Sequence, residues 1–309
     1  MNSLEEVFAL DTDSPLHRTR TAGIHRLLGH TAGPLVGRST VLAHALAHHF
    51  LEGAIAAAQT RDVEALTWYR SAPGNDYSAL MVDTDIGPAV VVAPNANELR
   101  RSDISDTPYY LINTATTAAG QRQRDQVRQA YAVAATAGFS TLLAGAAPIV
   151  CLLHQRRFDE TLHSWTISRL PGTVFTDYTY EPIVLARDLI HEAGHNWLNE
   201  RLVAYDSAIP GGVSYYSPWR ATERSAFGFL HACWSFPLTV LYAVEVLPHI
   251  TGAVREFMVA YLDLQHQMLA AAVDDFRHAV EHVCHHDLRR RMIDVFEAAI
   301  TTRHMGSFG

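Results

Sequence analysis

Hydrophobic positions follow a helical period at both ends of the chain. Between residues 39 and 72, apolar residues recur every three to four positions, and Ser39 and Thr40 are suited to cap the start of a helix. The last sixty residues show the same spacing and predict one or two amphipathic helices. An Ala-rich segment beginning at Gln121 is also helical in period. The pattern therefore predicts a helical N-terminal part, a helix after Gln121 and helices at the C-terminus.

Short strands are predicted where this period changes. Apolar runs at 148–154, 163–170 and 172–178 are separated by a charged loop and a Pro-Gly turn, and 79–108 contains further strand-like runs. A helix resumes at Pro182, a turn-rich loop covers 209–223, and an apolar helix interrupted at Pro237 ends near Pro248. We predict an α+β fold, mainly helical, with a small antiparallel sheet beside the helix that follows Pro182.

The predicted organisation is a single domain over residues 1–309. Its helical N-terminal part covers 1–144, a core covers 145–250, and C-terminal helices cover 251–309. A chain of this length can bury a sizeable core in one large domain.

Composition excludes several classes of function. The formal net charge of -8 argues against a nucleic-acid partner, and all 24 basic residues are Arg, which leaves no Lys for Schiff-base chemistry. Three widely separated cysteines form no metal-binding or redox pair. The N-terminus lacks a signal-peptide pattern, and no uninterrupted apolar run reaches about 18 residues. We therefore expect a cytoplasmic protein without a membrane partner.

The segment 188–202, DLIHEAGHNWLNERL, contains the pattern His-Glu-x-x-His. Residues four apart lie on one face of a helix, so His191 and His195 can bind one divalent metal ion, and Glu192 reaches the adjacent space. Gly194 lowers helix propensity by about 1 kcal/mol relative to Ala. Its presence predicts that another element packs closely against the helix at this point.

A third metal ligand must come from elsewhere, because the residues after His195 lack the Gly and third His of the metzincin pattern. Glu223 in TERSA could complete a zinc peptidase site in which Glu192 activates a metal-bound water. His231 lies in the next apolar segment, where an imidazole without a partner would be unfavourable. We favour His231 over Glu223.

Other histidines also have helical spacing. His44 and His48 are four apart, but no acidic residue accompanies them in their segment, and a partly exposed amphipathic helix explains them. His154, His163 and a C-terminal group lie in other segments, and the C-terminal segment is strongly charged; this group is His278, His282, His285 and His286. We do not expect a second metal site.

The residues around the metal motif resemble those of a known family. LIHEAGHNWLNERL followed by YYSPWRATERSAFGFLHACW is similar to HExxH-containing proteins encoded beside ribosomally made peptides, which are iron(II)/α-ketoglutarate-dependent peptide β-hydroxylases. The similar elements span about 145–245 and are the histidine pair with Leu198, the Pro218, Trp219 and Arg220 segment with Arg224, and Gly228 with His231. One element differs, because the family's DPRP is TERS in this chain.

This resemblance implies an Fe(II) centre, 2-oxoglutarate as co-substrate and a ribosomally made precursor peptide as substrate. The implied iron ligands are His191, His195 and His231, which leave positions for a bidentate 2-oxoacid and O2. Arg220 or Arg224 would bind the far carboxylate of 2-oxoglutarate. Glu192 would be a catalytic-site carboxylate beside the metal.

Two alternatives remain open at the level of sequence. One is a gluzincin-like zinc metallopeptidase in which Glu223 completes the ligand set and Glu192 is the general base. The other is a peptide-binding scaffold that keeps the helix without its chemistry. Tyr215, Tyr216 and Trp219 could line a pocket near the metal in either enzyme or could be core residues.

Overall fold

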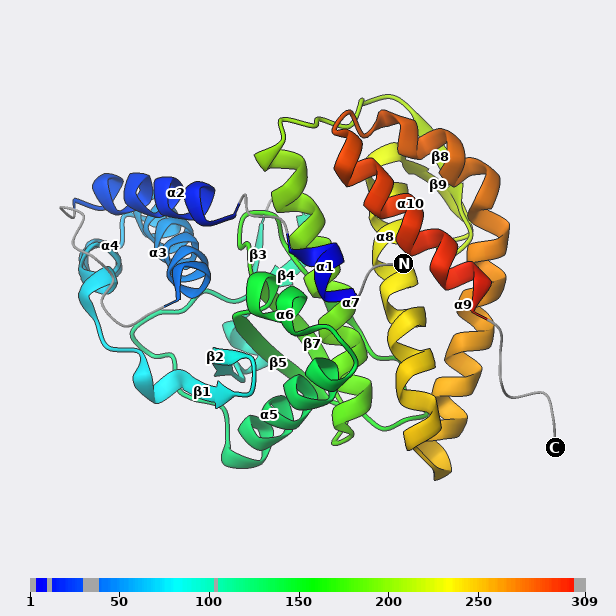
Figure 1. Cartoon of the computed structure of the whole chain (residues 1–309). Helices are drawn as coiled ribbons and strands as arrows, with labels where there is room; N and C mark the ends of the chain where they lie inside the picture. Colours follow the sequence, from blue (N-terminus) through cyan, green and yellow to red (C-terminus); the bar gives the residue numbers. More distant parts are fainter. Residues whose placement is uncertain (1–3, 10–12, 30–38, 103–104, 303–309) are drawn as a thin grey trace.

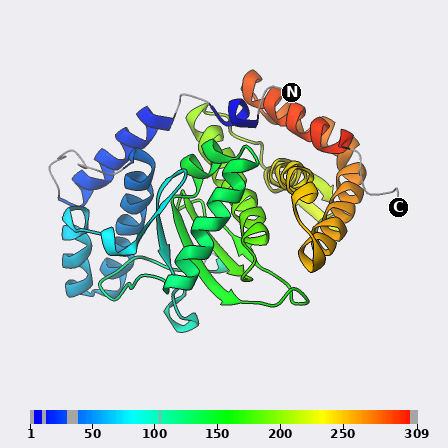
Figure 2. The ribbon, with the colours of Figure 1, turned by 60° about the horizontal axis from the view of Figure 1, so that its bottom comes forward.

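The computed structural model describes residues 4–9, 13–29, 39–102 and 105–302. Its helices dominate, and a small sheet lies among them, so the predicted mainly helical α+β class is confirmed. Helices α2 to α4 lie on one side of the sheet, helices α8 to α10 lie on the other side of the molecule, and α7 lies between them (Figures 1 and 2).

The helices match the periodic segments of the sequence closely. Those of the N-terminal part are α1 (Leu4–Phe8), α2 (Asp13–Leu27), α3 (Thr40–Thr60) and α4 (Val63–Ser71). Those of the middle and the C-terminal part are α5 (Gln121–Thr136), α6 (Ser140–Ala146), α7 (Pro182–Ala204), α8 (Ala226–Val246), α9 (Gly252–Ala279) and α10 (His286–Thr301). Ser39 caps α3 as predicted, because its Oγ accepts a hydrogen bond from the Leu42 amide at 3.1 Å.

The main sheet has the strand order β1-β2-β5-β7-β6. Its strands are β1 (Met81–Thr84), β2 (Gly87–Val92), β5 (Ile149–Gln155), β6 (Ser164–Trp165) and β7 (Thr173–Tyr178). The sheet is mixed, whereas the sequence predicted an antiparallel one: β2, β5 and β7 run parallel, and only the outer strands are antiparallel. Long connections before β5 and β7 allow the chain to return to the same end of the sheet.

Two further strand pairs are antiparallel. These are β3 (Arg100–Ser102) with β4 (Ser105–Tyr109), and β8 (Ser214–Ser217) with β9 (Thr222–Ser225). The second pair is a hairpin that covers much of the segment 209–223, which the sequence predicted to be a loop, and continues to Ser225. Its four-residue connection contains Ala221 with a φ of 50°, a left-handed conformation found in tight turns. Short strands with mostly exposed residues give little alternation to detect.

Residues of the central strands alternate between two hydrophobic cores. Val91, Val150 and Val174 face the core that includes α5, α7 and α8, whereas Ile149 and Phe175 face the core formed with α3 and α4. Helix α8 belongs to the first core and continues through Pro237, so of the break or kink that the sequence predicted there, the break does not occur. The sheet therefore lies between the core formed with α3 and α4 and the core that includes α5, α7 and α8.

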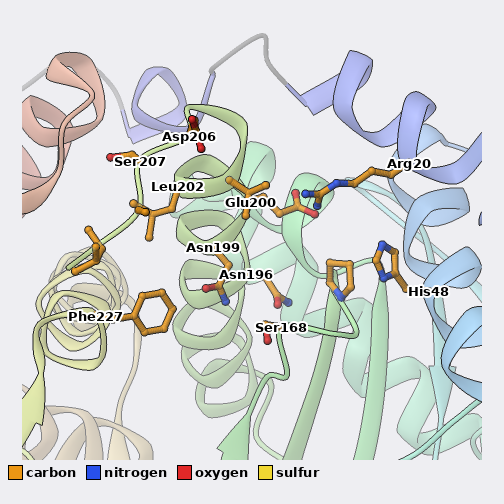
Figure 3. Close-up of a pocket in the computed structure, with 14 residues that line it drawn as sticks. Arg20, His48, Ser168, Asn196, Asn199, Glu200, Leu202, Asp206, Ser207 and Phe227 are labelled. Carbon is orange, nitrogen blue, oxygen red and sulfur yellow. The ribbon is translucent and has the colours of Figure 1, made fainter. Parts of the chain in front are cut away.

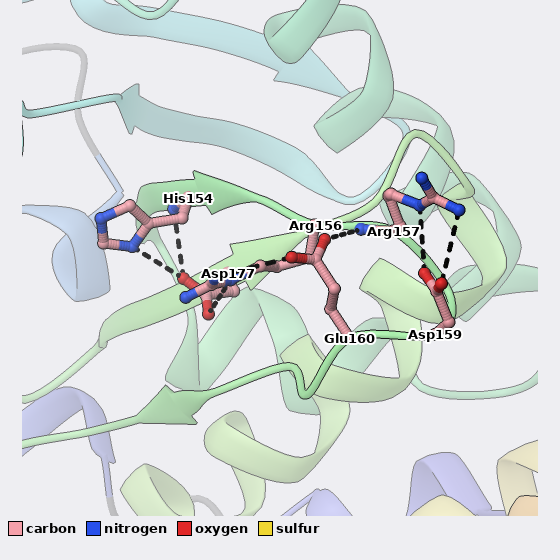
Figure 4. Close-up of polar contacts among 6 residues, drawn as sticks. All are labelled: His154, Arg156, Arg157, Asp159, Glu160 and Asp177. Carbon is pink, nitrogen blue, oxygen red and sulfur yellow. Dashed lines mark hydrogen bonds and ion pairs between the residues drawn. The ribbon is translucent and has the colours of Figure 1, made fainter.

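A polar network holds the loop between β5 and β6 (Figure 4). Asp177 on β7 is buried and accepts hydrogen bonds from the His154 amide and from Arg156 Nε, at 3.2 and 3.0 Å. The amide of Arg157 donates to Glu160 Oε2 at 2.7 Å. This network shapes the loop that leads to β6 and accounts for His154 without a metal ion.

Among the residues that the structure describes, two helices are long and apolar enough to cross a membrane by length and composition. They are Thr40–Thr60 and Ala226–His249. In the first, 61% of the apolar window is buried inside the protein, and in the second 83%. Such burial is typical of core helices.

Candidate metal centre

Helix α7 brings three potential ligands together. His191, Glu192 and His195 each offer a ligand atom, and these atoms all lie within 4.8 Å of one another. The Nε2 atoms of His191 and His195 are 3.2 Å apart. Two imidazole nitrogens that bind one ion at about 2.1 Å lie roughly 3.0–3.4 Å from each other, so this separation suits chelation.

Close packing of α8 against α7 places His231 beside this group. A Cβ atom on Gly194 would lie only 3.0 Å from Leu238 Cδ1 and from Ser235 Oγ, both on α8, which confirms the predicted close approach. The indole of Trp234 donates a hydrogen bond to the Gly194 carbonyl at 3.1 Å. Glycine is therefore favoured at position 194, because α8 packs so closely against α7 that a Cβ atom would press against its side chains.

His231 contacts the second nitrogen of His195. The Nδ1 atoms of the two residues are 3.0 Å apart, and Ser235 Oγ lies 3.1 Å from the same His195 nitrogen. The Nε2 atom of His231 is buried and has no hydrogen-bond partner within the described part of the chain. The three predicted histidines thus form a row with His195 in the middle, and His191 and His231 contact opposite nitrogens of its ring. Among the described residues, His231 therefore does not belong to the group formed by His191, Glu192 and His195, although its own buried Nε2 is free to bind a ligand or an ion.

Glu223 lies apart from the histidine pair. It is exposed on β9, opposite Tyr216 of β8. Among the residues that the structure describes, it shares no group of potential ligands with His191 and His195.

Glu192 is buried next to the histidines, with 2% of its surface exposed. Its Oε1 accepts a hydrogen bond from Ser164 Oγ of β6 at 2.8 Å, and its Oε2 has no partner in the described ranges. Burial raises the pKa of Glu192 to about 8; Ser164 lowers it and Asp188 raises it further. A cation beside Oε2 would favour the carboxylate over the protonated form. The donor set therefore fits a divalent metal ion.

The histidines are in the form that binds metals. Burial lowers the pKa of His195 to about 4, and burial also moves the pKa values of His191 and His231 well below their usual range. All three imidazoles are therefore neutral at neutral pH, and a neutral imidazole presents a lone pair to a cation.

Two arginines lie near these imidazoles. The positive charge of Arg224 lowers the pKa values of His195 and His231, and that of Arg220 lowers the pKa of His191. The Arg224 guanidinium crosses the start of α8, where a Cβ atom on Gly228 would lie 3.1 Å from its Nη2. Neither arginine forms an ion pair with a carboxylate of a described residue. The site therefore combines a cation-binding group with two cations that can bind an anion.

Aromatic side chains cover the His191 side of the group. The rings of Trp219 and Phe236 are stacked, with centroids 4.8 Å apart, and Phe236 lies 4.6 Å from the His191 ring. The indole of Trp219 donates to Gln265 Oε1 at 2.9 Å. The aromatic residues near the motif thus have different positions: Trp219 joins the wall of the site, whereas Tyr216 is exposed.

Sequence reasoning missed Ser164, Ser235 and Phe236. Ser164 approaches Glu192 only because β6 pairs with β7, with Ser164 opposite Thr176. Ser235 and Phe236 follow His231 by about one helical turn, so the helical period of α8 contained a signal for them.

The C-terminal histidines do not form a metal-binding group in the described chain. His282 Nε2 lies 2.8 Å from the Tyr215 hydroxyl, and His285 stacks on Tyr205 with ring centroids 3.5 Å apart. His285 also accepts a hydrogen bond from the Leu288 amide and caps α10.

The expectation for His44 is wrong. His44 is 1% exposed, and the carboxylate missing from its own segment is supplied by Glu200 of α7. A second group of potential ligands is therefore present, formed by Glu200 of α7 and two histidines that lie far from it in sequence, His17 and His44. Local sequence patterns cannot detect a ligand that comes from another helix.

A comparison of the chain with protein-family models found no match, and a search of curated proteins found no significant match either.

Proposed function

We propose that this protein is a non-haem Fe(II)/2-oxoglutarate-dependent oxygenase that hydroxylates a side-chain β-carbon of a ribosomally made peptide. The observation that carries the proposal is the position of Arg220 and Arg224, two arginines without acidic partners, beside three neutral imidazoles. A hydrolytic site needs a metal ion and a base, and an arginine that stabilises an oxyanion is an optional addition to it. A 2-oxoacid needs both a metal ion and a cationic partner for its far carboxylate.

In this proposal His191 and His195 hold the iron through their Nε2 atoms. His231 contacts the opposite nitrogen of His195, so it becomes the third ligand only if one of these two imidazoles turns. When bound, iron supplies the oxygen chemistry: 2-oxoglutarate, O2 and a substrate C–H group give succinate, CO2 and a hydroxylated product. The guanidinium of Arg224 or Arg220 orients the co-substrate by paired hydrogen bonds to its carboxylate. Trp219 and Phe236 limit the access of water on the His191 side.

The class of substrate rests on the resemblance described for residues 145–245. The differing TERS segment is β9, which carries Arg224 at its third position. The arginine is therefore retained where the prolines are not, which supports the same use of this side chain.

The deciding experiment is metal analysis of anaerobically purified protein together with a 2-oxoglutarate titration. We expect iron to bind and 2-oxoglutarate affinity to depend on iron. With a co-encoded precursor peptide and O2, succinate should form and the peptide should gain the mass of one oxygen atom. Tightly bound zinc without any 2-oxoglutarate binding, and no turnover of such peptides, would contradict the proposal.

A zinc metallopeptidase is the second candidate. The observation in its favour is Glu192, a buried carboxyl beside the histidine pair whose pKa of about 8 suits a general base at neutral pH. This reading requires Glu192→Gln to abolish peptide cleavage and Glu223→Ala to weaken zinc binding. The matched variant His231→Ala separates the two candidates. Only the oxygenase proposal requires that the His231→Ala protein loses its metal ion and that the Glu223→Ala protein keeps its metal ion.

A further inference from the structure

The second group of potential ligands lies where three helices meet. His17 comes from α2, His44 from α3 and Glu200 from α7, and their side chains are buried. His17 Nε2 lies 2.8 Å from Glu200 Oε2, and His44 Nε2 lies 3.6 Å from Glu200 Oε1. The ligand atoms of all three residues lie within 4.8 Å of one another. Neighbouring ligands of one transition-metal ion are about 3 Å apart, so a small inward movement suffices.

Hydrogen bonding within the protein does not satisfy this group. The contact between His17 and Glu200 uses one imidazole nitrogen, but His44 Nε2 is buried and has no hydrogen-bond partner among the described residues. The rings of His17 and His44 are stacked with centroids 4.3 Å apart, and both direct a nitrogen toward the same carboxylate. Leaving such a buried polar atom unpaired is unfavourable, whereas a cation between these atoms would satisfy it.

We propose that His17, His44 and Glu200 bind a second divalent transition-metal ion, independent of the ion at His191 and His195. Two imidazoles and one carboxylate are a ligand set that zinc and ferrous iron both accept. Both sites use α7, but Glu200 is five residues after His195 and therefore projects from a different side of the helix. There it meets α2 and α3, whereas His195 faces α8.

Glu200 lines a cavity of about 360 Å³, whereas His17 and His44 do not line it. Arg20, His48 and Asn199 line the same cavity, and Figure 3 shows the Arg20 side chain extending toward Glu200. His48 Nε2 is also buried without a partner within the described ranges. The cavity therefore reaches the proposed site at Glu200, where the guanidinium of Arg20 suits an anionic ligand, such as a carboxylate.

The cavity also approaches the first centre. Phe227 lines it, and the ring centroid of Phe227 lies 4.3 Å from that of His231. Phe227 therefore lies between the cavity and the histidine row.

The test uses the full-length chain with His191→Ala and His195→Ala, which removes the first centre. After removal of metal with a chelator and addition of Zn2+ or Co2+, the dialysed protein should retain one ion per chain. Adding Glu200→Gln should weaken binding about 100-fold, because an amide of the same shape is a poor ligand. Glu52→Gln is the matched control, since Glu52 pairs with Arg169 on the surface and should leave binding unchanged.

Circular dichroism of each variant separates loss of metal from loss of fold. If the Glu200→Gln protein does not fold, the Co2+ absorption spectrum of the His191→Ala, His195→Ala protein is measured instead. A spectrum typical of imidazole and carboxylate ligands would support the site. A folded protein that retains no ion, or one that keeps its ion after Glu200→Gln, would overturn the proposal. The first centre is tested separately, by comparing the number of ions bound to the unmodified chain with the number bound to the His191→Ala, His195→Ala protein.

Discussion

Ser164 Oγ of β6 donates a hydrogen bond to Glu192 Oε1 of α7, and the two atoms are 2.8 Å apart. Glu192 Oε2 has no partner within the part of the chain that the structure describes. Ser164 therefore fixes which carboxyl oxygen remains available for an ion. The sheet contributes to the centre through this contact, although the candidate metal ligands lie on helices.

Replacing Ser164 with Ala should weaken metal binding at the first centre about tenfold, because residues that orient ligands typically contribute this much to affinity. Without the hydroxyl the pKa of Glu192 rises further, and a proton competes better with the metal ion. Competition with a chelator of known affinity measures the change. Ser71→Ala, which alters an exposed hydroxyl on α4, serves as control. Equal affinity of the Ser164 variant and the control would show that this contact does not support the site.

The raised pKa of Glu192 predicts a pH-dependent stability difference. A group whose pKa rises on folding stabilises the protein below its unfolded pKa of 4.5, and this stabilisation is lost as pH rises through about 8. We therefore compare the free energies of unfolding of the metal-free Glu192→Gln variant and the metal-free parent. The two values should be similar near pH 5, and the value for the variant should be a few kcal/mol larger at about pH 8. Urea unfolding at both pH values measures the difference. The titration of the histidines cancels in this comparison, because both proteins contain the same histidines. A difference independent of pH would contradict the prediction.

The helical period, the start of α7 at Pro182 and the three central strands could be predicted from local patterns. The mixed order of the sheet could not, because strand direction depends on where long connections return. The histidine pair and His231 could be selected because a buried imidazole in an apolar helix needs a partner. Glu200 could not be linked to His17 and His44, since its contacts cross 183 and 156 residues of chain.

Gly194→Ala should destabilise the protein despite the higher helix propensity of Ala. Its Cβ would lie 3.0 Å from Ser235 Oγ and Leu238 Cδ1, so α8 must move away from α7. We expect a loss of about 1–3 kcal/mol, as for other overpacked core sites, and weaker metal binding because Ser235 also contacts His195. Gly23→Ala is the matched control in α2: its Cβ would meet no atom within 4 Å, so thermal unfolding should show a gain of up to about 1 kcal/mol. A stabilised Gly194 variant would contradict the packing argument.

Arg224→Gln separates binding of the co-substrate from binding of the metal. Under the proposed function, loss of paired charge-assisted hydrogen bonds should weaken 2-oxoglutarate binding about 10- to 100-fold. Iron binding should be unchanged or tighter, because the charge of Arg224 lowers the pKa values of His195 and His231 and repels a cation. Arg224→Lys should recover only part of the co-substrate affinity, since an ammonium group cannot make the paired contact.

Arg277→Gln is the control for this prediction. It removes an exposed surface charge on α9 and should alter neither the 2-oxoglutarate affinity nor the iron affinity. Calorimetric titration of 2-oxoglutarate into the iron-loaded proteins measures these affinities. If both arginine variants bind 2-oxoglutarate like the parent, the role assigned to Arg224 fails, and Arg220 is the residue to vary next.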